Sequence, residues 1–406
     1  MAKNNYYKAL LLRELYYSHK LSCADLSEAI QKSLPLTMKM LNELIEEGIV
    51  SESGYAPSSG GRRPISYSIK EDTIYILSVA MDQLVTRIAL LDINNKLVTE
   101  EERFEFPLSK DPAGINILAD KMEEVIRNSG IDKRKIIGAG IGMPGFIDFK
   151  KGINYSYLES KEKTLTQNLS DRLNMPVYVD NDSSLVALAE FRFGAAREKR
   201  NAMVINVSWG IGLGMILNGE LFRGHNGFAG EFSHIPMFNN NRLCDCGKSG
   251  CLETEASLKV VIEKAAAELK QGRISALGDN FPTGHPERDW EAMVSAALKG
   301  DRFVVGLLSN TGYDIGRAIA ILIHIVNPET VILSGRGTLA GKVWQAPIQQ
   351  ALNEHSIPRL SQNTTLAIST LGYQSELIGS AALVMENCVR DLSRVGDGEY
   401  NNATTV

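Results

Sequence analysis

Two groups of strands and helices follow one another from residue 73, and this repetition is the feature that most constrains the fold. The first group has three consecutive strands, a helix and two further strands, at 73–82, 86–94, 97–106, 113–129, 136–141 and 177–180. The second group begins with a strand hairpin at 201–224, whose tight turn is at 218–219. A long helix at 302–326, a strand at 330–335 and a late helix at 376–387 follow, and a helix at 183–193 joins the two groups. Because alternating strands and helices build α/β layers, the repeated unit predicts a two-lobed α/β body with a cleft.

Residues 1–70 have a different pattern, made of three helices and a pair of strands. The first helix is predicted at 5–17, and Ser22 with Asp25 three residues later has the arrangement of a helix-capping box. Pro35 suits the first turn of a third helix. The inner face of that helix is predicted to contain Met38, Leu41 and Ile45. A short strand, a tip rich in Gly, Ser and Pro, and an alternating strand at 65–69 complete a winged helix-turn-helix layout.

The winged helix predicts DNA binding through the third helix and the wing. The N-terminal end of the helix would enter the major groove, and glycines at the wing tip would let arginines approach a narrow minor groove. The residues expected to contact DNA are Pro35, Leu36, Thr37, Lys39, Arg62 and Arg63. A protein-interaction module is the alternative, because Glu43, Glu46 and Glu47 make the far end of the helix acidic.

Charge and composition limit the class of protein further. The chain carries a net charge of −5, whereas residues 1–70 hold nine Lys or Arg against seven Asp or Glu, which suits a small DNA-binding head on an acidic body. No apolar run reaches the roughly 18 residues of a membrane span. Charges interrupt the apolar stretch at the N-terminus, unlike a signal peptide, so a cytoplasmic protein is expected.

Three of the five cysteines fall within eight positions, after a histidine. The predicted ligand set, in the spacing H-x9-C-x-C-x4-C, is His234, Cys244, Cys246 and Cys251. One imidazole and three thiolates complete a tetrahedral zinc site, and four protein ligands leave no open position, so the ion would be structural. Gly247 and Gly250 supply the backbone freedom that a tight loop needs. The alternative is a loop of buried free cysteines.

Four ordered segments resemble motifs of one family. The ROK family has a G-x-P-G-x-[VI]-D segment, which "IGMPGFID" resembles, and an N-D-A-N catalytic stretch, which "YVDNDSSLVALAEFRFGAA" resembles. The family segment before the zinc site resembles "LNGELFRGHNGFAGEFSH", and the zinc signature of the family resembles "GEFSH…CDCGKSGCLE". This family contains bacterial sugar kinases and sugar-responsive repressors. The resemblance implies a two-lobed actin-like, ribonuclease-H-like sugar kinase fold behind the head. The repressors of the family also carry a stretch similar to "GGRRP".

The resemblance also implies a sugar site. The corresponding residues are Gly145, Asn181, Asp182, Glu231, His234 and Glu253. Carboxylates and an amide suit the vicinal hydroxyls of a sugar, and a metal-bound His234 would turn its second ring nitrogen towards the sugar. In the kinases the position of Asp182 is the general base. The alternatives are surface glutamates and a helix-capping role for Asp182.

The nucleotide motifs of the kinases are altered in this chain. The family pattern D-x-G-G-T has Leu84 and Val85 in place of its two glycines, and G-T-G-I-G-G-G has Trp209 and Leu213 where Thr and Gly are expected. Arg336 stands where the kinases usually carry another glycine. Because a phosphate cradle needs close backbone approach, ATP binding is not expected, which is typical of the repressor branch.

These features together predict a sugar-responsive transcriptional regulator of the repressor type, and not an enzyme. The predicted domains are a DNA-binding head at 1–70, a sugar-binding body at 71–390 and a polar tail at 391–406. One head buries too little surface for tight operator binding, so a homodimer or tetramer on an inverted repeat is expected. An ATP-dependent sugar kinase with Asp182 as base, and an adaptor that binds a transport or signalling protein, are the alternatives.

Overall fold

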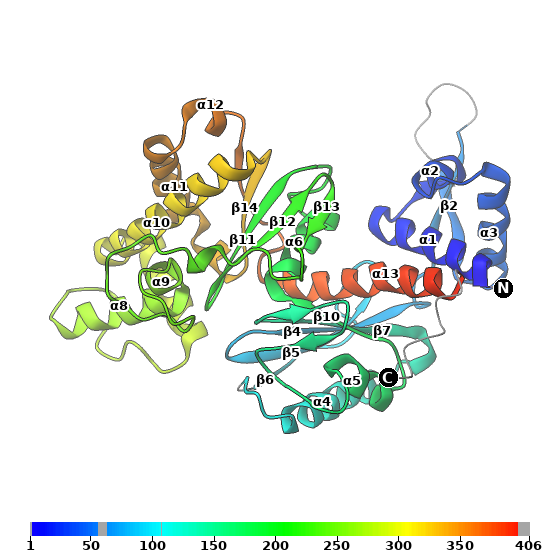
Figure 1. Cartoon of the computed structure of the whole chain (residues 1–406), viewed down its shortest axis with the longest axis horizontal. Helices are drawn as coiled ribbons and strands as arrows, with labels where there is room; N and C mark the ends of the chain where they lie inside the picture. The colour runs from blue at the N-terminus through cyan, green and yellow to red at the C-terminus, as the bar shows by residue number, and fades with distance from the viewer. Residues whose placement is uncertain (1, 56–62, 107, 397–406) are drawn as a thin grey trace. The chain divides into compact units, whose positions relative to one another are not determined.

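The computed structural model describes residues 2–55, 63–106 and 108–396, and these form two compact units (Figure 1). The first contains residues 1–180 and 380–406 of the numbering, and the second contains 181–379. The predicted head at 1–70 is therefore grouped with the first lobe. The helix α13 (Ser375–Gly396) begins in the second unit and ends in the first. None of the described helices combines the length and the apolar character that a bilayer span requires.

The head has the predicted winged-helix elements. They are α1 (Ala2–Ser18), β1 (Leu21–Ser22), α2 (Cys23–Ala29), α3 (Leu34–Glu46), β2 (Val50–Tyr55) and β3 (Ile65–Ile69), with the strands in the order β1-β3-β2. The capping box of Ser22 and Asp25 is confirmed, as is the position of Pro35 in the first turn of α3. The wing tip at 56–62, including Arg62, lies outside the described residues.

The buried face of α3 differs from the sequence prediction. Its fully buried residues are Thr37, Met40, Leu41 and Leu44. Met38 and Ile45, which were expected inside, are only half-buried. The helix carries more apolar residues than one face can hold, so the apolar pattern alone set its rotation incorrectly.

The rest of the first unit is a five-stranded sheet with helices against it. The strand order is β10-β7-β4-β5-β6. Its strands are β4 (Tyr75–Met81), β5 (Val85–Asp92), β6 (Glu102–Glu105), β7 (Ile136–Met143) and β10 (Val177–Asn181), with η1 (Lys133–Lys135) before β7 and a separate ribbon of β8 (Ile147–Asp148) and β9 (Ile153–Asn154). β4 pairs antiparallel with β5 and parallel with β7. The helices α4 (Ala113–Ser129) and α5 (Leu165–Leu173) contribute apolar residues to the same core cluster as these strands.

The second unit repeats this strand arrangement. Its order is β13-β12-β11-β14-β15, with β11 antiparallel to β12 and parallel to β14. The strands are β11 (Ala202–Val207), β12 (Ile211–Leu217), β13 (Glu220–Phe222), β14 (Thr330–Ser334) and β15 (Thr365–Ile368). Asn218 and Gly219 both have positive φ, so the tight turn between β12 and β13 is confirmed. The duplicated sheet is the basis of the predicted two-lobed α/β fold.

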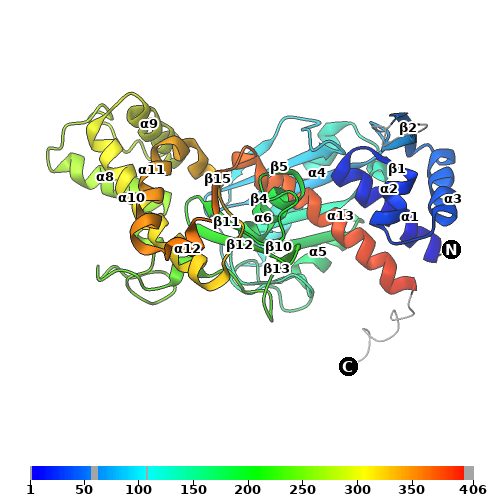
Figure 2. The same cartoon turned by 90° about the horizontal axis from the view of Figure 1, so that it is seen from above.

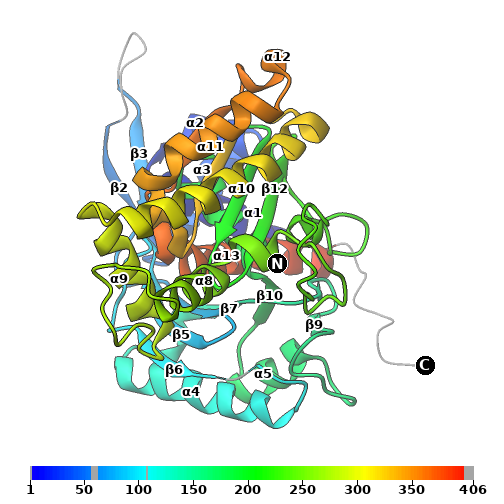
Figure 3. The same cartoon turned by 90° about the vertical axis from the view of Figure 1, so that its left-hand side faces the viewer.

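Helices and short turns surround the second sheet. They are α6 (Asp182–Phe193), η2 (Phe232–His234), α7 (Glu253–Ala256), α8 (Leu258–Lys270), α9 (Pro286–Leu298), α10 (Arg302–Val326), η3 (Arg336–Ala340), α11 (Gly341–His355), α12 (Pro358–Ser361) and η4 (Gly372–Gln374). The long helix predicted at 302–326 is α10, and Figure 3 shows it beside α11. Gly312 and Gly316 permit this packing, because a Cβ on Gly316 would lie 2.7 Å from the Ala351 Cβ.

Two buried tyrosines attach the head to the rest of the first unit. The Tyr16 hydroxyl donates a hydrogen bond to Asn95, in the turn after β5. The Tyr17 hydroxyl donates to the Ala382 carbonyl of α13, at 3.4 Å, and α1 lies beside α13 in Figure 2. The helix α13 continues past its predicted end at residue 387 into the segment predicted as a tail, and residues 397–406 lie outside the described part of the chain.

Candidate functional site

The histidine and the three clustered cysteines lie together in the loops between β13 and α7. Their ligand atoms are all within 4.8 Å of one another. The His234 Nδ1 is 3.4 Å from the Cys244 Sγ, and the Cys246 Sγ is 3.6 Å from the Cys251 Sγ. The loop needs Gly250, whose φ is +80° and whose Cβ would lie 2.1 Å from the Phe238 carbonyl oxygen. The cluster can therefore hold a metal ion.

The three thiols differ in their pKa. Burial raises the pKa of Cys244 and raises that of Cys251 to about 12, whereas the pKa of Cys246 is lowered despite burial, by the Lys248 backbone N–H and the neighbouring thiols. Burial also lowers the pKa of His234, with a smaller contribution from the nearby Lys248 cation, so the ring is neutral at pH 7. Because a metal binds thiolates and neutral imidazole, binding would release protons, and affinity would rise with pH.

The second ring nitrogen of His234 lies on the side of a carboxylate, whereas the sequence predicted that it would turn towards a sugar. The His234 Nε2 is 3.6 Å from the Glu231 Oε2. A metal on Nδ1 would fix the ring, so that Nε2 stays directed to this side. A metal ion in the cluster would therefore fix the position of the His234 ring beside Glu231.

The start of α6 distinguishes the roles of Asn181 and Asp182. Asn181 is the N-cap, and its Oδ1 accepts hydrogen bonds from the N–H groups of Ser183 and Ser184, at 3.0 and 3.2 Å. Asp182 is the first residue of the helix, and its Oδ1 accepts from the Ser183 N–H at 2.8 Å. The capping role considered for Asp182 therefore belongs to Asn181.

The carboxyl groups of this region have raised pKa values. Burial, followed by the negative charge of Glu376, raises the pKa of Asp182 to about 7. Burial raises the pKa of Glu253 to about 7 and also raises that of Glu231. Glu231 acts electrostatically on both other groups, which places the three carboxyls around one region of the second unit. Near neutral pH such groups can both donate and accept hydrogen bonds.

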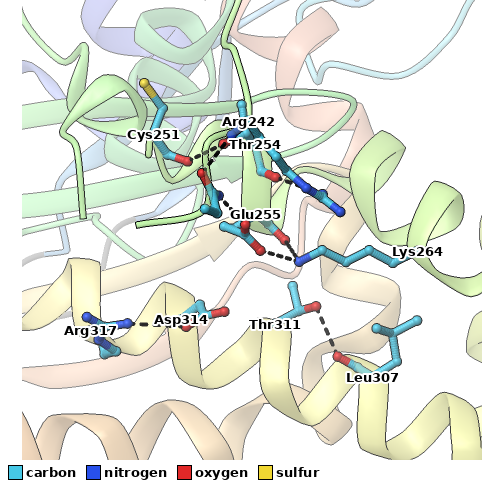
Figure 4. Close-up of polar contacts among 10 residues, drawn as sticks. Arg242, Cys251, Thr254, Glu255, Lys264, Leu307, Thr311, Asp314 and Arg317 are labelled. Carbon is cyan, nitrogen blue, oxygen red and sulfur yellow. Dashed lines mark hydrogen bonds and ion pairs between the residues drawn. The ribbon is translucent and has the colours of Figure 1, made fainter. Parts of the chain in front are cut away.

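Glu253 is held from two sides and lies two residues after Cys251. Its Oε2 accepts a hydrogen bond from the Ile211 N–H at 2.9 Å. The short helix α7 that it begins is anchored by a network drawn in Figure 4. In that network the Thr254 hydroxyl donates to the Cys251 carbonyl at 2.8 Å, and the Lys264 Nζ donates to the Glu255 carbonyl at 2.9 Å. The metal loop and the Glu253 carboxyl therefore share one scaffold.

Gly145 is the one predicted sugar-site residue in the first unit. It follows β7 in a left-handed turn with a φ of +103°, and its Cβ would lie 2.7 Å from the Ser156 Cβ. The Phe146 N–H donates to the Ser156 hydroxyl at 3.0 Å, which fixes the turn. Glycine is required here because a side chain would meet both strain and a steric clash.

Bulky side chains occupy the nucleotide motif of the second unit. The Arg336 guanidinium lies 4.8 Å from the Trp209 ring centroid and 3.7 Å from the Tyr373 ring centroid. It also forms an ion pair with Glu287 at 2.6 Å. Trp209 is 2% exposed and Arg336 7%. We call Trp209, Arg336, Tyr373 and Glu287 the stack. In the stack, the Arg336 guanidinium is paired with a carboxylate and enclosed by two aromatic rings.

The altered motif of the first unit has its backbone donors occupied. The Asp82 Oδ1 accepts hydrogen bonds from the N–H groups of Leu84 and Val85, each at 2.8 Å. The side chains of Leu84 and Val85 are half-buried. A phosphate cradle works through free N–H groups, and these two are bonded within their own turn.

The predicted DNA-contact residues are not all on the surface. Pro35, Lys39 and Arg63 are exposed and Leu36 is half-buried. Thr37 was expected to contact bases, but it is 0% exposed and its hydroxyl donates to the Ser33 carbonyl at 3.1 Å. Thr37 therefore supports the helix from inside the head.

A family model describes this body. The model of the ROK family matches residues 78–387. The chain belongs to the ROK family. The xylose repressor of Caldicellulosiruptor bescii is 27% identical to it over 94% of this chain and 95% of the repressor. A glucokinase of Halalkalibacterium halodurans is 31% identical over 70% of this chain and 88% of the kinase.

A solved structure of a ROK family transcriptional regulator, described as a homologue of the E. coli MLC protein, confirms the fold of this ROK chain. It superposes with a TM-score of 0.78 at 24% identity and covers 98% of this chain and 100% of the other. The matches to both regulators cover nearly all of this chain, so they include most of the head. The glucokinase match leaves 30% of the chain unmatched.

Proposed function

We propose that this ROK chain is a sugar-responsive transcriptional repressor. The head at 1–70 binds operator DNA, and the body at 71–390 binds a sugar or sugar phosphate. The sugar contacts are proposed to be Gly145, Asn181, Asp182, Glu231, His234 and Glu253. The ligand binds the DNA-bound and the DNA-free form of the protein with different affinities. This difference, typically about 1–3 kcal/mol, sets the change in operator affinity. Such a protein acts in the cytoplasm, where its DNA is.

One observation carries this proposal: the stack of Trp209, Arg336, Tyr373 and Glu287 stands at the nucleotide motif, while the acidic set is kept. Arg336 is paired with Glu287 at 2.6 Å and covered by two rings, so it is not available to a triphosphate. Asp182, Glu231 and Glu253 retain the carboxyls that a sugar needs. A protein that binds the sugar without ATP is suited to sensing it.

We assign a structural zinc ion to His234, Cys244, Cys246 and Cys251. One nitrogen and three soft sulfur ligands suit Zn²⁺. The ion would hold the loop that carries Glu253 and orient His234 towards Glu231. The DNA contacts are assigned to Pro35, Leu36, Lys39, Arg62 and Arg63, and a homodimer supplies two heads for an inverted repeat.

A sugar kinase is the second candidate, favoured by one specific observation. Asp182 has a pKa of about 7, close to the value that suits a general base at neutral pH. The same carboxyl can simply accept a hydrogen bond from a sugar hydroxyl. The glucokinase relative keeps this candidate open.

Three measurements distinguish the candidates. A thermal-shift screen of the full chain with hexoses, pentoses, N-acetylhexosamines and their phosphates should identify a ligand. DNA binding, measured on sequences selected from a random duplex library, should then change when that ligand is added. A coupled assay with ATP and each sugar should show no turnover above background. Turnover at about 1 s⁻¹ or faster would favour the kinase, and selection of no DNA sequence would contradict the repressor.

A further inference from the structure

The surface of α3 differs from the one that the apolar pattern suggested, and the difference exposes a polar residue. Four exposed residues of the helix are Pro35, Lys39, Asn42 and Glu46. Their spacing of four, three and four positions puts them on one face of an α-helix. The opposite face holds the buried residues Thr37, Met40, Leu41 and Leu44. Lys39 and Asn42 lie at the centre of the exposed face.

The amide of Asn42 is available to a ligand. Within the described part of the chain, neither the Asn42 carboxamide nor the Lys39 ammonium makes a hydrogen bond or an ion pair. Asparagine is a poor choice for a solvated helix interior. A free amide beside a free cation therefore suggests a polar partner for this face.

The acidic end of α3 is compensated by the neighbouring helix. Lys8 of α1 forms ion pairs with Glu43 at 2.9 Å and with Glu47 at 2.6 Å. The hydrogen bonds that Lys8 donates to Glu47 and Glu43 raise the pKa of Lys8, which keeps it charged. Two of the three carboxylates that argued for a protein-interaction surface thus carry a counter-charge. The third, Glu46, lies on the exposed face two turns from Lys39, so a polyanion fits the N-terminal part of this face, around Lys39.

We propose that Asn42 is a base-reading residue that recognises an adenine in the major groove, next to the base or phosphate contacted by Lys39. The inference rests on the proposed function of the head. From Pro35 to Asn42 the helix rises about 10 Å, which matches about three base-pair steps of 3.4 Å. Asparagine pairs with the N6 and N7 atoms of adenine, whereas lysine contacts guanine or a phosphate.

The experiment uses the full chain and a random duplex library from which bound DNA is selected and sequenced. The wild type should select a motif that contains an adenine one or two base pairs from the Lys39 contact. Asn42→Ala should select the same motif without that adenine preference. On one fixed operator, replacing the adenine should weaken the wild type about tenfold to a hundredfold, and should leave Asn42→Ala unchanged.

Two further variants keep the result interpretable. Glu46→Ala, on the same face nearer the end of α3, is the matched control and should retain the adenine preference. Asn42→Gln keeps an amide and should show a weaker or shifted adenine preference. It replaces Asn42→Ala in the comparison if circular dichroism shows that Asn42→Ala folds poorly. An unchanged motif in both Asn42 variants would overturn the inference while leaving DNA binding intact. Selection of no motif by the wild type would overturn the proposed function and this inference together.

Discussion

The acidic region around Asp182 and the stack around Arg336 belong to the same unit, and they differ in how their charged groups are treated. The acidic region gathers three carboxyls whose pKa values are raised by burial. The stack encloses one cation, pairs it with Glu287 and covers it with Trp209 and Tyr373. The first arrangement is costly unless a ligand uses it. In the second, the charge of Arg336 is paired with Glu287, although the buried Trp209 Nε1 makes no hydrogen bond within the described part of the chain.

This difference teaches which half of a kinase-like site has been kept. Clustered acidic groups with raised pKa values are typical of binding sites, which supports the proposed sugar site at this end. At the nucleotide end, side chains of the protein now make the contacts that a ligand would otherwise make. The same holds at Asp82, which accepts from the N–H groups of Leu84 and Val85. The proposed function therefore combines a retained sugar site with a nucleotide motif that is filled by side chains of the protein.

The largest effect is expected from breaking the scaffold of the sugar end. Cys251→Ser removes a buried thiolate ligand from the four-residue cluster, and a structural zinc site with three ligands loses most of its affinity. Elemental analysis should find about one zinc per wild-type chain and far less in the variant, with sugar binding lost in calorimetry. Cys388→Ser, outside the cluster, should keep both. Full zinc content in Cys251→Ser would remove this residue from the ligand set.

The next effect concerns the nucleotide end. Trp209→Ala removes a side chain that is 2% exposed and that stacks on Arg336. It should lower the free energy of unfolding by about 3–5 kcal/mol, measured by urea denaturation, and leave the affinity for the sugar nearly unchanged. Leu243→Ala, at a residue that is 79% exposed, should change stability little. A stable Trp209→Ala variant with weakened sugar binding would mean that the two ends are not separate.

A smaller effect is expected from one carboxyl of the sugar end. Asp182→Ala should weaken binding of the identified sugar about tenfold to a hundredfold in calorimetry, because a hydrogen bond to a charged group contributes about 1.5–3 kcal/mol. Asp171→Ala, on the exposed surface of the first unit, is the control. If Asp182→Ala binds the sugar as tightly as the wild type does, Asp182 does not contact it.

Local signals in the sequence predicted much of this picture. The spacing of His234 and the three cysteines was sufficient to group four ligands, and the Ser22 capping box and the Asn218-Gly219 turn depend on neighbouring residues only. The missed features depend on long-range contacts or on a choice of helix rotation. Glu376 acts on Asp182 from more than a hundred residues away, and Tyr373 contacts Arg336 across 37 residues. The excess of apolar residues in α3 concealed both the burial of Thr37 and the exposed Asn42.

The last effect is a pH dependence of stability. Asp182 has a pKa of about 7 in the folded chain against an ordinary value of 3.8, so the folded state binds more protons than the unfolded state between these values. Stability must therefore fall as pH rises from about 4 to about 7. Asp182→Asn cannot ionise at this position. The Tm of the variant minus the Tm of the wild type should therefore increase from about pH 4 to about pH 7 and stay constant above that range. A constant Tm difference from about pH 4 to about pH 8 would show that the Asp182 pKa is not raised.

The most direct test of the central claim is a calorimetric titration of the full-length wild type with Mg²⁺ and a non-hydrolysable ATP analogue, with the identified sugar present. The closed nucleotide end predicts no saturable binding with a Kd below about 1 mM, or about −4 kcal/mol, while the sugar itself binds. Saturable binding of the analogue with a Kd in the micromolar range would contradict the account, because the volume held by Trp209 and Arg336 would then be open to a nucleotide.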